Sequence, residues 1–183
     1  MLHLVVGRQG SGKTLFLVKI AYDDYKKGKT IYSNVHLKFP YKKLNYNDII
    51  NCKLQNATVI IDEIHILLPS RNSMQVRSRK ICDGFISMIR KKNLEVYGTT
   101  QFERKVDIRI RDEKDFYYIC SKWSFLNNKW GEILHNQNMS KKIPTMIKLN
   151  IIEMFSYAEL ETSFIANPYY NMYDTNQVIQ IED

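Results

Sequence analysis

The chain has 183 residues, of which 44% are hydrophobic, and its formal net charge is +8. This length suits one domain with a substantial core, and no apolar run is long enough to span a membrane. The first residues do not resemble a secretion signal, and the three cysteines show neither a disulfide framework nor a metal-binding spacing. We therefore expect a protein of a reducing compartment that is not secreted. The basic charge favours a polyanionic partner, although a solvated basic surface would account for it equally well.

A phosphate-loop pattern lies near the start of the sequence. Residues 7–14 fit the template G-x-x-x-x-G-K-[ST] at every fixed position. The apolar run Leu2–Val6 before them predicts a buried strand, and the apolar residues after them predict a helix that ends near Lys27, before Gly28. A strand, a glycine-rich turn and a helix in this order are the context that distinguishes a functional phosphate loop from a chance match.

The residue types of this loop suit the binding of ATP with Mg²⁺. Glycines let successive backbone N–H groups converge on an anion, and the following helix adds its positive dipole end. Lys13 would reach the β- and γ-phosphates as a catalytic cation, and Thr14 would place its hydroxyl on the metal. The alternative is a glycine-rich turn without a ligand. The predicted nucleotide-binding residues are Gly7, Arg8, Gln9, Gly10, Ser11, Gly12, Lys13, Thr14 and Leu15.

Two adjacent carboxylates follow a second buried strand. After a predicted strand at residues 29–35 and a short helix near residues 47–51, the apolar run Ala57–Ile61 leads into Asp62 and Glu63. Asp62 would hold the Mg²⁺ shell, usually through water, and Glu63 would polarise the attacking water as a general base. An acidic strand end without a catalytic role is the alternative. The adjacent glutamate favours hydrolysis of ATP over transfer to a small acceptor.

The next segment predicts a basic helix and then another strand. A helix over residues 72–92 carries arginines and lysines near both ends and an apolar stripe between them. The following strand ends in Thr-Thr-Gln, and in a parallel sheet such carboxyl ends meet at the ligand crevice. Gln101 would therefore sense the γ-phosphate, or it is simply part of a polar strand terminus. We expect His65 to be a structural histidine rather than a site residue.

Two arginines follow in the segment Val-Asp-Ile-Arg-Ile-Arg-Asp. Arg109 and Arg111 would project to one side if this segment were extended. Either could act as a finger on the γ-phosphate of an adjacent subunit. Either could equally pair with Asp107, Asp112 or Glu113.

The character of the chain changes after about residue 121, where aromatic residues alternate with Asn and Lys. A strand is predicted from Pro144 to Ile152, and the tail over residues 167–183 is expected to be partly extended. We predict an α/β fold, a P-loop NTPase with a three-layer αβα sandwich, a mostly parallel central sheet and antiparallel strands appended at the C-terminal end. One domain would cover residues 1–183, with a core at 2–120 and a β-rich extension at 121–183.

These elements, taken in order, resemble the FtsK–HerA superfamily of DNA-pumping P-loop ATPases. Within it, residues 2–120 resemble the Zot-like assembly ATPases of filamentous phages and the small genome-packaging ATPases of viruses with internal membranes. The matching elements are the phosphate loop, Ser33-Asn34, Ile61-Asp62-Glu63, Ser70-Arg71, Arg90-Lys91-Lys92, Thr99-Thr100-Gln101 and the arginine segment after residue 104.

The resemblance implies an ATP-driven motor that translocates double-stranded DNA. It would work as a homo-oligomeric ring, a pentamer or hexamer, docked on a capsid or virion-membrane protein, in the host cytoplasm or associated with the virion. Zot-like proteins typically continue into a membrane span, which this sequence lacks, so genome packaging is favoured over phage extrusion. A nucleotide kinase, with residues 70–80 as a lid, and a DNA-binding protein switched by ATP are the remaining alternatives.

Overall fold

The computed structural model of the chain describes residues 1–51, 53–68, 76–124 and 145–174, with the backbone alone at residues 46, 76–79 and 124. Within these ranges the strands form one sheet in the order β3-β2-β4-β5-β1-β6-β7-β8. The strands are β1 (Leu2–Val6), β2 (Thr30–Ser33), β3 (Lys42–Lys43), β4 (Ala57–Ile61), β5 (Leu94–Thr100), β6 (Phe116–Ser124), β7 (Thr145–Glu153) and β8 (Glu159–Ile165). The pairings from β3 to β6 are parallel, and β7 and β8 are antiparallel additions beyond β6.

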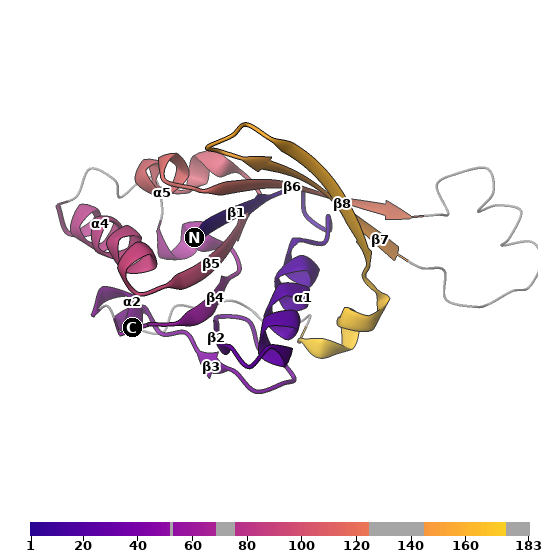
Figure 1. Cartoon of the computed structure of the whole chain (residues 1–183), viewed down its shortest axis with the longest axis horizontal. Coiled ribbons are helices and arrows are strands. Elements are labelled where there is room, and N and C mark those ends of the chain that lie inside the picture. Colours follow the sequence, from indigo (N-terminus) through magenta and orange to yellow (C-terminus); the bar gives the residue numbers. More distant parts are fainter. Residues whose placement is uncertain (52, 69–75, 125–144, 175–183) are drawn as a thin grey trace, which may run out of the picture.

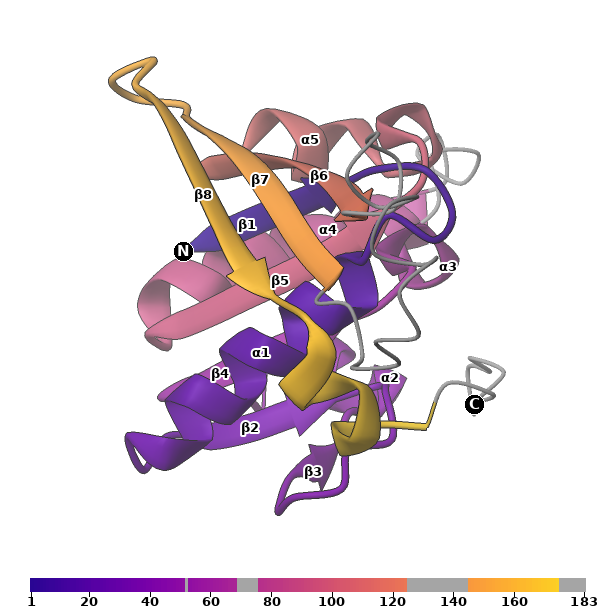
Figure 2. The ribbon, with the colours of Figure 1, turned by 90° about the vertical axis from the view of Figure 1, so that its right-hand side faces the viewer.

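Helices cover both faces of this sheet (Figures 1 and 2). One face carries α1 (Lys13–Lys26) and the 3₁₀ helix η4 (Asn167–Met172). The other carries α2 (Tyr46–Ile50), α3 (Ile64–Leu67), α4 (Val76–Lys91) and α5 (Ile108–Asp112), with the short 3₁₀ helix η2 (Glu103–Lys105) before α5. The predicted three-layer α/β fold, with a mostly parallel sheet and appended antiparallel strands, is confirmed. Within the described residues, no helix is both long and apolar enough to cross a membrane.

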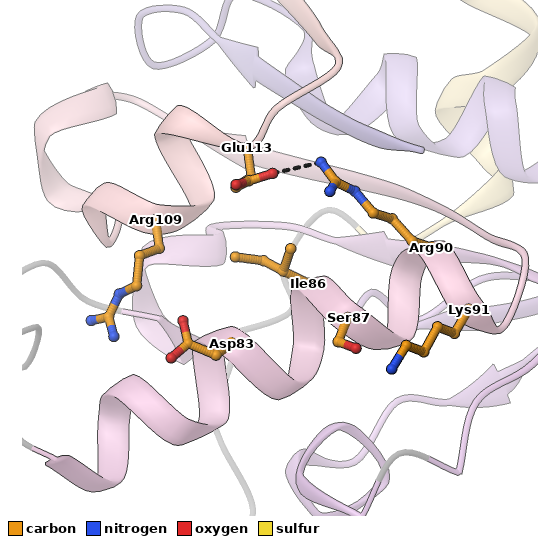
Figure 3. Close-up of a pocket in the computed structure, with 7 residues that line it drawn as sticks. All are labelled: Asp83, Ile86, Ser87, Arg90, Lys91, Arg109 and Glu113. Atoms are coloured by element: carbon orange, nitrogen blue, oxygen red, sulfur yellow. Dashed lines mark hydrogen bonds and ion pairs between the residues drawn. The ribbon is translucent and has the colours of Figure 1, made fainter.

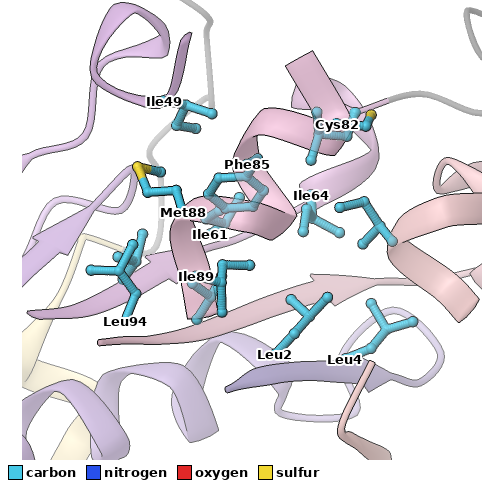
Figure 4. Packing of buried hydrophobic residues seen from close by; sticks show 14 of the residues in the cluster. Leu2, Leu4, Ile49, Ile61, Ile64, Cys82, Phe85, Met88, Ile89 and Leu94 are labelled. Atoms are coloured by element: carbon cyan, nitrogen blue, oxygen red, sulfur yellow. The ribbon is translucent and has the colours of Figure 1, made fainter. Parts of the chain in front are cut away.

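The largest apolar cluster packs α4 against the sheet (Figure 4). Cys82, Phe85, Met88 and Ile89 are buried along one side of α4, which is the spacing of an amphipathic helix. Strands β1 and β4 are buried at every position, because helices cover both of their faces. This central position explains why both strands are short apolar runs, and it places their carboxyl ends side by side with that of β5.

The antiparallel strands are tied to the phosphate-loop region by their own core. Ile147 and Leu149 of β7 are buried with Leu15 and Phe16 of α1. Gly12 is the point of closest approach, because a Cβ atom there would overlap the side chain of Ile147. The C-terminal strands therefore pack directly on the phosphate loop.

Several predicted boundaries differ from the structure. Residues 69–75 lie outside the described residues, as do the side chains of Arg77 and Arg79, so the start of the predicted basic helix is seen only from Val76. The tail over residues 167–183, predicted to be partly extended, begins with the 3₁₀ helix η4, where Pro168 occupies the first turn, and is extended at Tyr173. Residues 175–183 of this tail lie outside the described residues. The segment with the two arginines is the helix α5 rather than an extended chain.

Candidate active site

The phosphate loop connects β1 to α1 in the conformation that its glycines permit. Gly10 and Gly12 have φ angles of +74° and +96°, in the left-handed region that side chains other than glycine rarely adopt. The loop closes on itself where the N–H of Ser11 donates to the carbonyl of Arg8 at 3.1 Å. Gly12 is the N-cap of α1 and offers no side-chain acceptor, so the first N–H groups of the helix are directed at whatever lies over the loop.

Lys13 folds back over this loop. Its Nζ donates to the carbonyl oxygens of Gly7 and Arg8 at 3.0 and 3.2 Å, and the residue is 6% exposed. A buried ammonium needs such acceptors. The cation is therefore held at the place where an anion bound by the loop would meet it.

Thr14 and Asp62 join the phosphate loop to the end of β4. The Thr14 hydroxyl donates to Asp62 Oδ2 at 2.8 Å, and the Thr99 hydroxyl donates to Asp62 Oδ1. The backbone of Asp62 is held on both sides by the Asn34 side chain, which accepts from its N–H and donates to its carbonyl, each at 2.8 Å. The first turn of α1 and the ends of β2, β4 and β5 thus meet at Asp62.

Glu63 adopts an unusual backbone conformation beside this carboxylate. Its φ of +52° lies in the left-handed region, which costs free energy for a residue with a side chain. Its N–H donates to the hydroxyl of Thr99 at 3.0 Å. Gln101 Nε2 donates to Glu63 Oε1 at 3.5 Å. Because β5 lies between β1 and β4 in the sheet, Gln101 stands between the phosphate loop and the two carboxylates.

His65 lies closer to Glu63 than expected of a purely structural histidine. Its Nδ1 is 3.2 Å from Glu63 Oε2 and 3.3 Å from the hydroxyl of Thr100. Glu63 Oε2 is buried and makes no hydrogen bond within the described residues. His65 is therefore placed within 3.2 Å of an oxygen that makes no other contact to a donor within the described residues.

Arg109 and Arg111 do not share a side. Asp107 caps α5 by accepting the N–H of Arg109 at 3.0 Å, so the segment is helical and the condition for a shared side, an extended chain, is not met. Residues two apart on a helix differ in direction by about 200°. Arg109 forms a bidentate pair with the buried Asp107, at 2.9 Å to each oxygen, and this hydrogen bonding raises the pKa of Arg109.

The same arginine lines a hollow of about 380 Å³ between α4 and α5, remote from the phosphate loop (Figure 3). Arg90 and Glu113 form an ion pair at 2.6 Å on its rim. Arg111 differs from Arg109, since its Nε is buried without a hydrogen-bond partner in the described part of the chain. Of the two predicted finger residues, Arg111 is thus the one with an unmet donor.

A second hollow of about 230 Å³ lies over the phosphate loop, and sequence reasoning missed part of its lining. Its walls come from Gly10, Gly12, Lys13, Thr14 and Leu15 and from Lys122, Tyr170 and Tyr173. The last three, like Asn34 and Thr99, were not among the predicted site residues. They belong to no local motif, and a tyrosine-rich tail was the only signal for two of them.

Buried Cys120 lies against the loop as well. Its thiol donates to the carbonyl of Ser11 at 3.2 Å, and burial raises its pKa to about 11. A thiol that stays protonated is a poor nucleophile and metal ligand. Cys120 therefore acts as a packing residue beneath the loop.

This fold, with the phosphate loop and the paired carboxylates at the ends of neighbouring strands, is that of the P-loop NTPases. No known family model matches the sequence, and no curated protein matches it either.

Solved structures are similar in fold over nearly the whole chain. The N-terminal domain of zonular occludens toxin from Neisseria meningitidis is 16% identical with a TM-score of 0.64, covering 94% of this chain and 98% of that one. The genome packaging NTPase B204 from Sulfolobus turreted icosahedral virus 2, in complex with ATP-gammaS, is 15% identical with a TM-score of 0.55, covering 87% and 95%. The ATPase domain of G40P is 12% identical with a TM-score of 0.57, covering 94% and 83%. The first two are proteins of the kinds that the sequence resembles.

Proposed function

We propose that this chain is a Mg²⁺-dependent ATPase that translocates double-stranded DNA, in the packaging of a viral genome. The observation that carries the proposal is the hydrogen bond from Thr14 to Asp62 at 2.8 Å, which joins a phosphate loop to a strand-end carboxylate 48 residues away. Beside it, Glu63 is held in a conformation that costs free energy, as residues at catalytic sites often are.

The oxygen atoms of this pair suit Mg²⁺, which prefers hydroxyl and carboxylate oxygens together with phosphate. Thr14 and Asp62 would hold the ion, Asp62 through water. When bound, the ion would neutralise charge on the β- and γ-phosphates. The carboxylate is already oriented for this by Thr99 and Asn34.

The chain's own groups divide the remaining work. Lys13 exchanges the carbonyls of Gly7 and Arg8 for phosphate oxygens. Glu63 accepts the proton of the attacking water. Gln101, whose Nε2 donates to Glu63 Oε1, orients that water against the γ-phosphate. The first N–H groups of α1 and of the loop surround the phosphates.

Several observations support a nucleic-acid motor in particular. The formal net charge of +8 suits a polyanionic partner. B204, one of the similar structures, is named a genome packaging NTPase. We propose a homo-oligomeric ring of five or six subunits as the working form, docked on a capsid or virion-membrane protein, in the host cytoplasm or on the virion.

A Zot-like assembly ATPase is the second candidate function. It is favoured by the match to the N-terminal domain of zonular occludens toxin, which spans 98% of that chain. The two candidates share the nucleotide site and differ in what hydrolysis drives. An ATPase rate that is the same with and without duplex DNA, whatever its length, would favour the assembly function.

Phosphate release from ATP tests the proposal. Purified protein with Mg²⁺ and ATP should release phosphate without a nucleoside acceptor, and the rate should rise when double-stranded DNA is added. Lys13→Ala is the inactive control. Strict dependence on a nucleoside or nucleotide acceptor would replace the motor with a nucleotide kinase. Nucleotide binding with DNA affinity but no turnover would indicate an ATP-switched DNA-binding protein.

Mixed oligomers test the shared site. Arg111→Ala subunits retain their own phosphate loop, whereas Lys13→Ala subunits retain Arg111. If Arg111 acts on the neighbour's nucleotide, mixing the two inactive variants should restore part of the activity. No recovery at any ratio would argue against a finger offered between subunits. Arg109→Ala is the matched comparison, and its ion pair with Asp107 predicts a loss of stability instead.

A further inference from the structure

The hollow over the phosphate loop has one wall that the loop does not supply. Gly12, Lys13 and Thr14 form its floor, and Leu15 carries it along the start of α1. A nucleotide with its phosphates in the loop would lie along these residues, and the part that leaves the loop would face the opposite side of this hollow. Its volume of about 230 Å³ is below that of a pocket enclosing a whole ligand, about 300–1,000 Å³, so it suits one part of a nucleotide.

The opposite wall is the segment around η4, which is fixed at both ends. The N–H of Ala166 donates to the carbonyl of Thr145 at 2.8 Å, at the start of β7. The N–H of Lys38 donates to the carbonyl of Met172 at 2.8 Å, and Tyr173 forms a β-bridge with Leu37. Figure 2 shows η4 lying beside α1, on the same face of the sheet. The wall thus spans from the C-terminal strands to the loop after β2.

Two tyrosines of this wall line the hollow, at different distances from the metal-binding pair. Tyr173 pairs with Leu37 in the loop after β2, and that loop also carries Asn34, which holds the backbone of Asp62, so Tyr173 lies on the side of the carboxylates. Burial raises the pKa of Tyr173. Tyr170 is partly exposed and lines the hollow together with Leu15. It is therefore the aromatic ring that a base leaving the loop would meet.

Lys122 reaches the same hollow from β6. Side chains two residues apart on a strand point to one face, and Cys120 on that face already contacts the loop through Ser11. Lys122 is also opposite Ile147 in the antiparallel register, and Ile147 abuts Gly12. Its ammonium is thus carried over the phosphate loop by the end of β6, where this strand pairs with β7.

We propose that these residues form the second half of the nucleotide site, in which Tyr170 stacks on the base of a nucleoside triphosphate and Lys122 contacts its phosphate chain. This inference rests on the proposed nucleotide-binding function and deepens it. Tyr173 closes the end of the hollow near Asp62. The C-terminal segment is then a part of the binding site and not only a structural addition.

Equilibrium binding of ATP and of inorganic tripolyphosphate, which lacks base and ribose, tests the assignment. Tyr170→Ala should weaken ATP binding about tenfold to a hundredfold, the range of one base–aromatic stack, and leave tripolyphosphate binding unchanged. Tyr170→Phe should bind ATP as the original protein does. Tyr170→Leu keeps the apolar volume without the π-face and should behave like Tyr170→Ala, which excludes a loss caused by unfolding. Lys122→Ala should weaken both ligands alike.

Matched controls come from the same strands. Phe155→Ala removes an aromatic ring that is 81% exposed beyond the end of β7, and Lys148→Ala removes a lysine that pairs with Glu161 at 2.6 Å. Neither should change the binding of ATP or tripolyphosphate. If Tyr170→Ala weakens both ligands equally or neither, the stacking assignment is wrong while the proposed function stands. If the original protein binds neither ligand, both proposals are wrong.

Discussion

The two halves of the nucleotide site are built by different rules. In the phosphate-loop half, the side chains come from the ends of parallel strands and from the first turn of α1, and hydrogen bonds such as Thr14 to Asp62 link these elements directly. In the C-terminal half, which comprises β7, β8 and η4, side chains arrive by strand register and by backbone bonds to distant loops. We propose that the first half carries out the chemistry and that the second half encloses the nucleotide.

This difference shows what a motif encodes. The relative position of a phosphate loop and a strand-end carboxylate can be predicted from sequence, because parallel strands bring their carboxyl ends to one edge of any such sheet. Enclosure depends on which strand pairs with which, and here Lys122 reaches the loop only because β6 pairs with both β1 and β7. Substitutions in the phosphate-loop half should therefore change the rate of ATP turnover, and substitutions in the C-terminal half should change nucleotide binding.

The largest effect is expected at Glu63. Glu63→Gln keeps the size of the side chain and its neighbours but cannot accept a proton from water, and general-base catalysis contributes about 10²–10⁴ in rate. ATP binding should be retained and phosphate release should fall by at least about a hundredfold. Steady-state turnover and a nucleotide-binding titration check this together. Unchanged turnover would remove Glu63 from the role of base.

Gly12→Ala should disturb the joint between the two halves. An alanine at φ +96° is strained, and its Cβ would overlap Ile147, so we expect a loss of about 2–4 kcal/mol in the free energy of unfolding. Gly10→Ala is the matched control, because Gly10 has φ +74° but no neighbour within 4 Å. It should cost about 1–2 kcal/mol from strain alone. Urea unfolding measures both.

The double variant Gly12→Ala with Ile147→Val distinguishes the steric overlap with Ile147 from the backbone strain at residue 12. The shorter side chain removes part of the overlap, so the double variant should recover some stability relative to Gly12→Ala. Equal costs at Gly10 and Gly12, with no recovery, would show that β7 does not press on the phosphate loop.

A smaller effect is expected at His65, which contacts only the chemical half. Its imidazole lies 3.2 Å from the otherwise undonated Oε2 of Glu63. His65→Ala should lower kcat about two- to tenfold, the size of one net hydrogen bond, and leave the KM for ATP unchanged. His65→Asn, which retains a donor near Glu63, should recover most of the rate. A rise in KM with constant kcat would instead place His65 in binding.

The chemical half was predictable because its signals are local. Asp62, Glu63 and Gln101 each follow a short apolar strand, and the structure brings all three to one edge. Asn34 and Thr99, which orient Asp62, also lie at strand ends, and they belong to the matching elements of the resemblance without a predicted role of their own. Their contacts are set by the order of the strands in the sheet.

Two features of the structure could not be predicted from the local sequence, for different physical reasons. The sequence left the conformation of the segment before Asp112 open, with its two arginines on one side if it were extended, but the side chain of Asp107 caps a short helix there. Tyr170 could not be predicted as a site residue, because its position depends on backbone bonds between η4 and the loop after β2. Local residue propensities predict neither that Asp107 caps a helix nor that η4 pairs with the loop after β2.

The smallest predicted effect concerns a buried aromatic stack that joins β1 to its neighbours β5 and β6. His3 of β1 is 5% exposed and stacks between Tyr97 of β5 and Phe116 of β6, while its ring nitrogens contact Tyr118 and Glu95. Burial lowers the pKa of His3 despite the nearby carboxylates of Glu95 and Asp115. The folded chain thus favours neutral His3, whereas the unfolded chain binds a proton below about pH 6.5.

Stability from this group is therefore fully present above about pH 6.5 and is lost as the pH falls below that value, by less than about 1.4 kcal/mol per pH unit. His3→Gln keeps two hydrogen-bonding groups but does not titrate, so its unfolding free energy should be lower at pH 7.5 and flatter between pH 7.5 and pH 5.5. Urea unfolding of both proteins across this range measures the difference. Parallel profiles would mean that His3 titrates equally in the folded and unfolded chains. The aromatic stack around His3 would then stabilise the fold by packing alone, independently of pH.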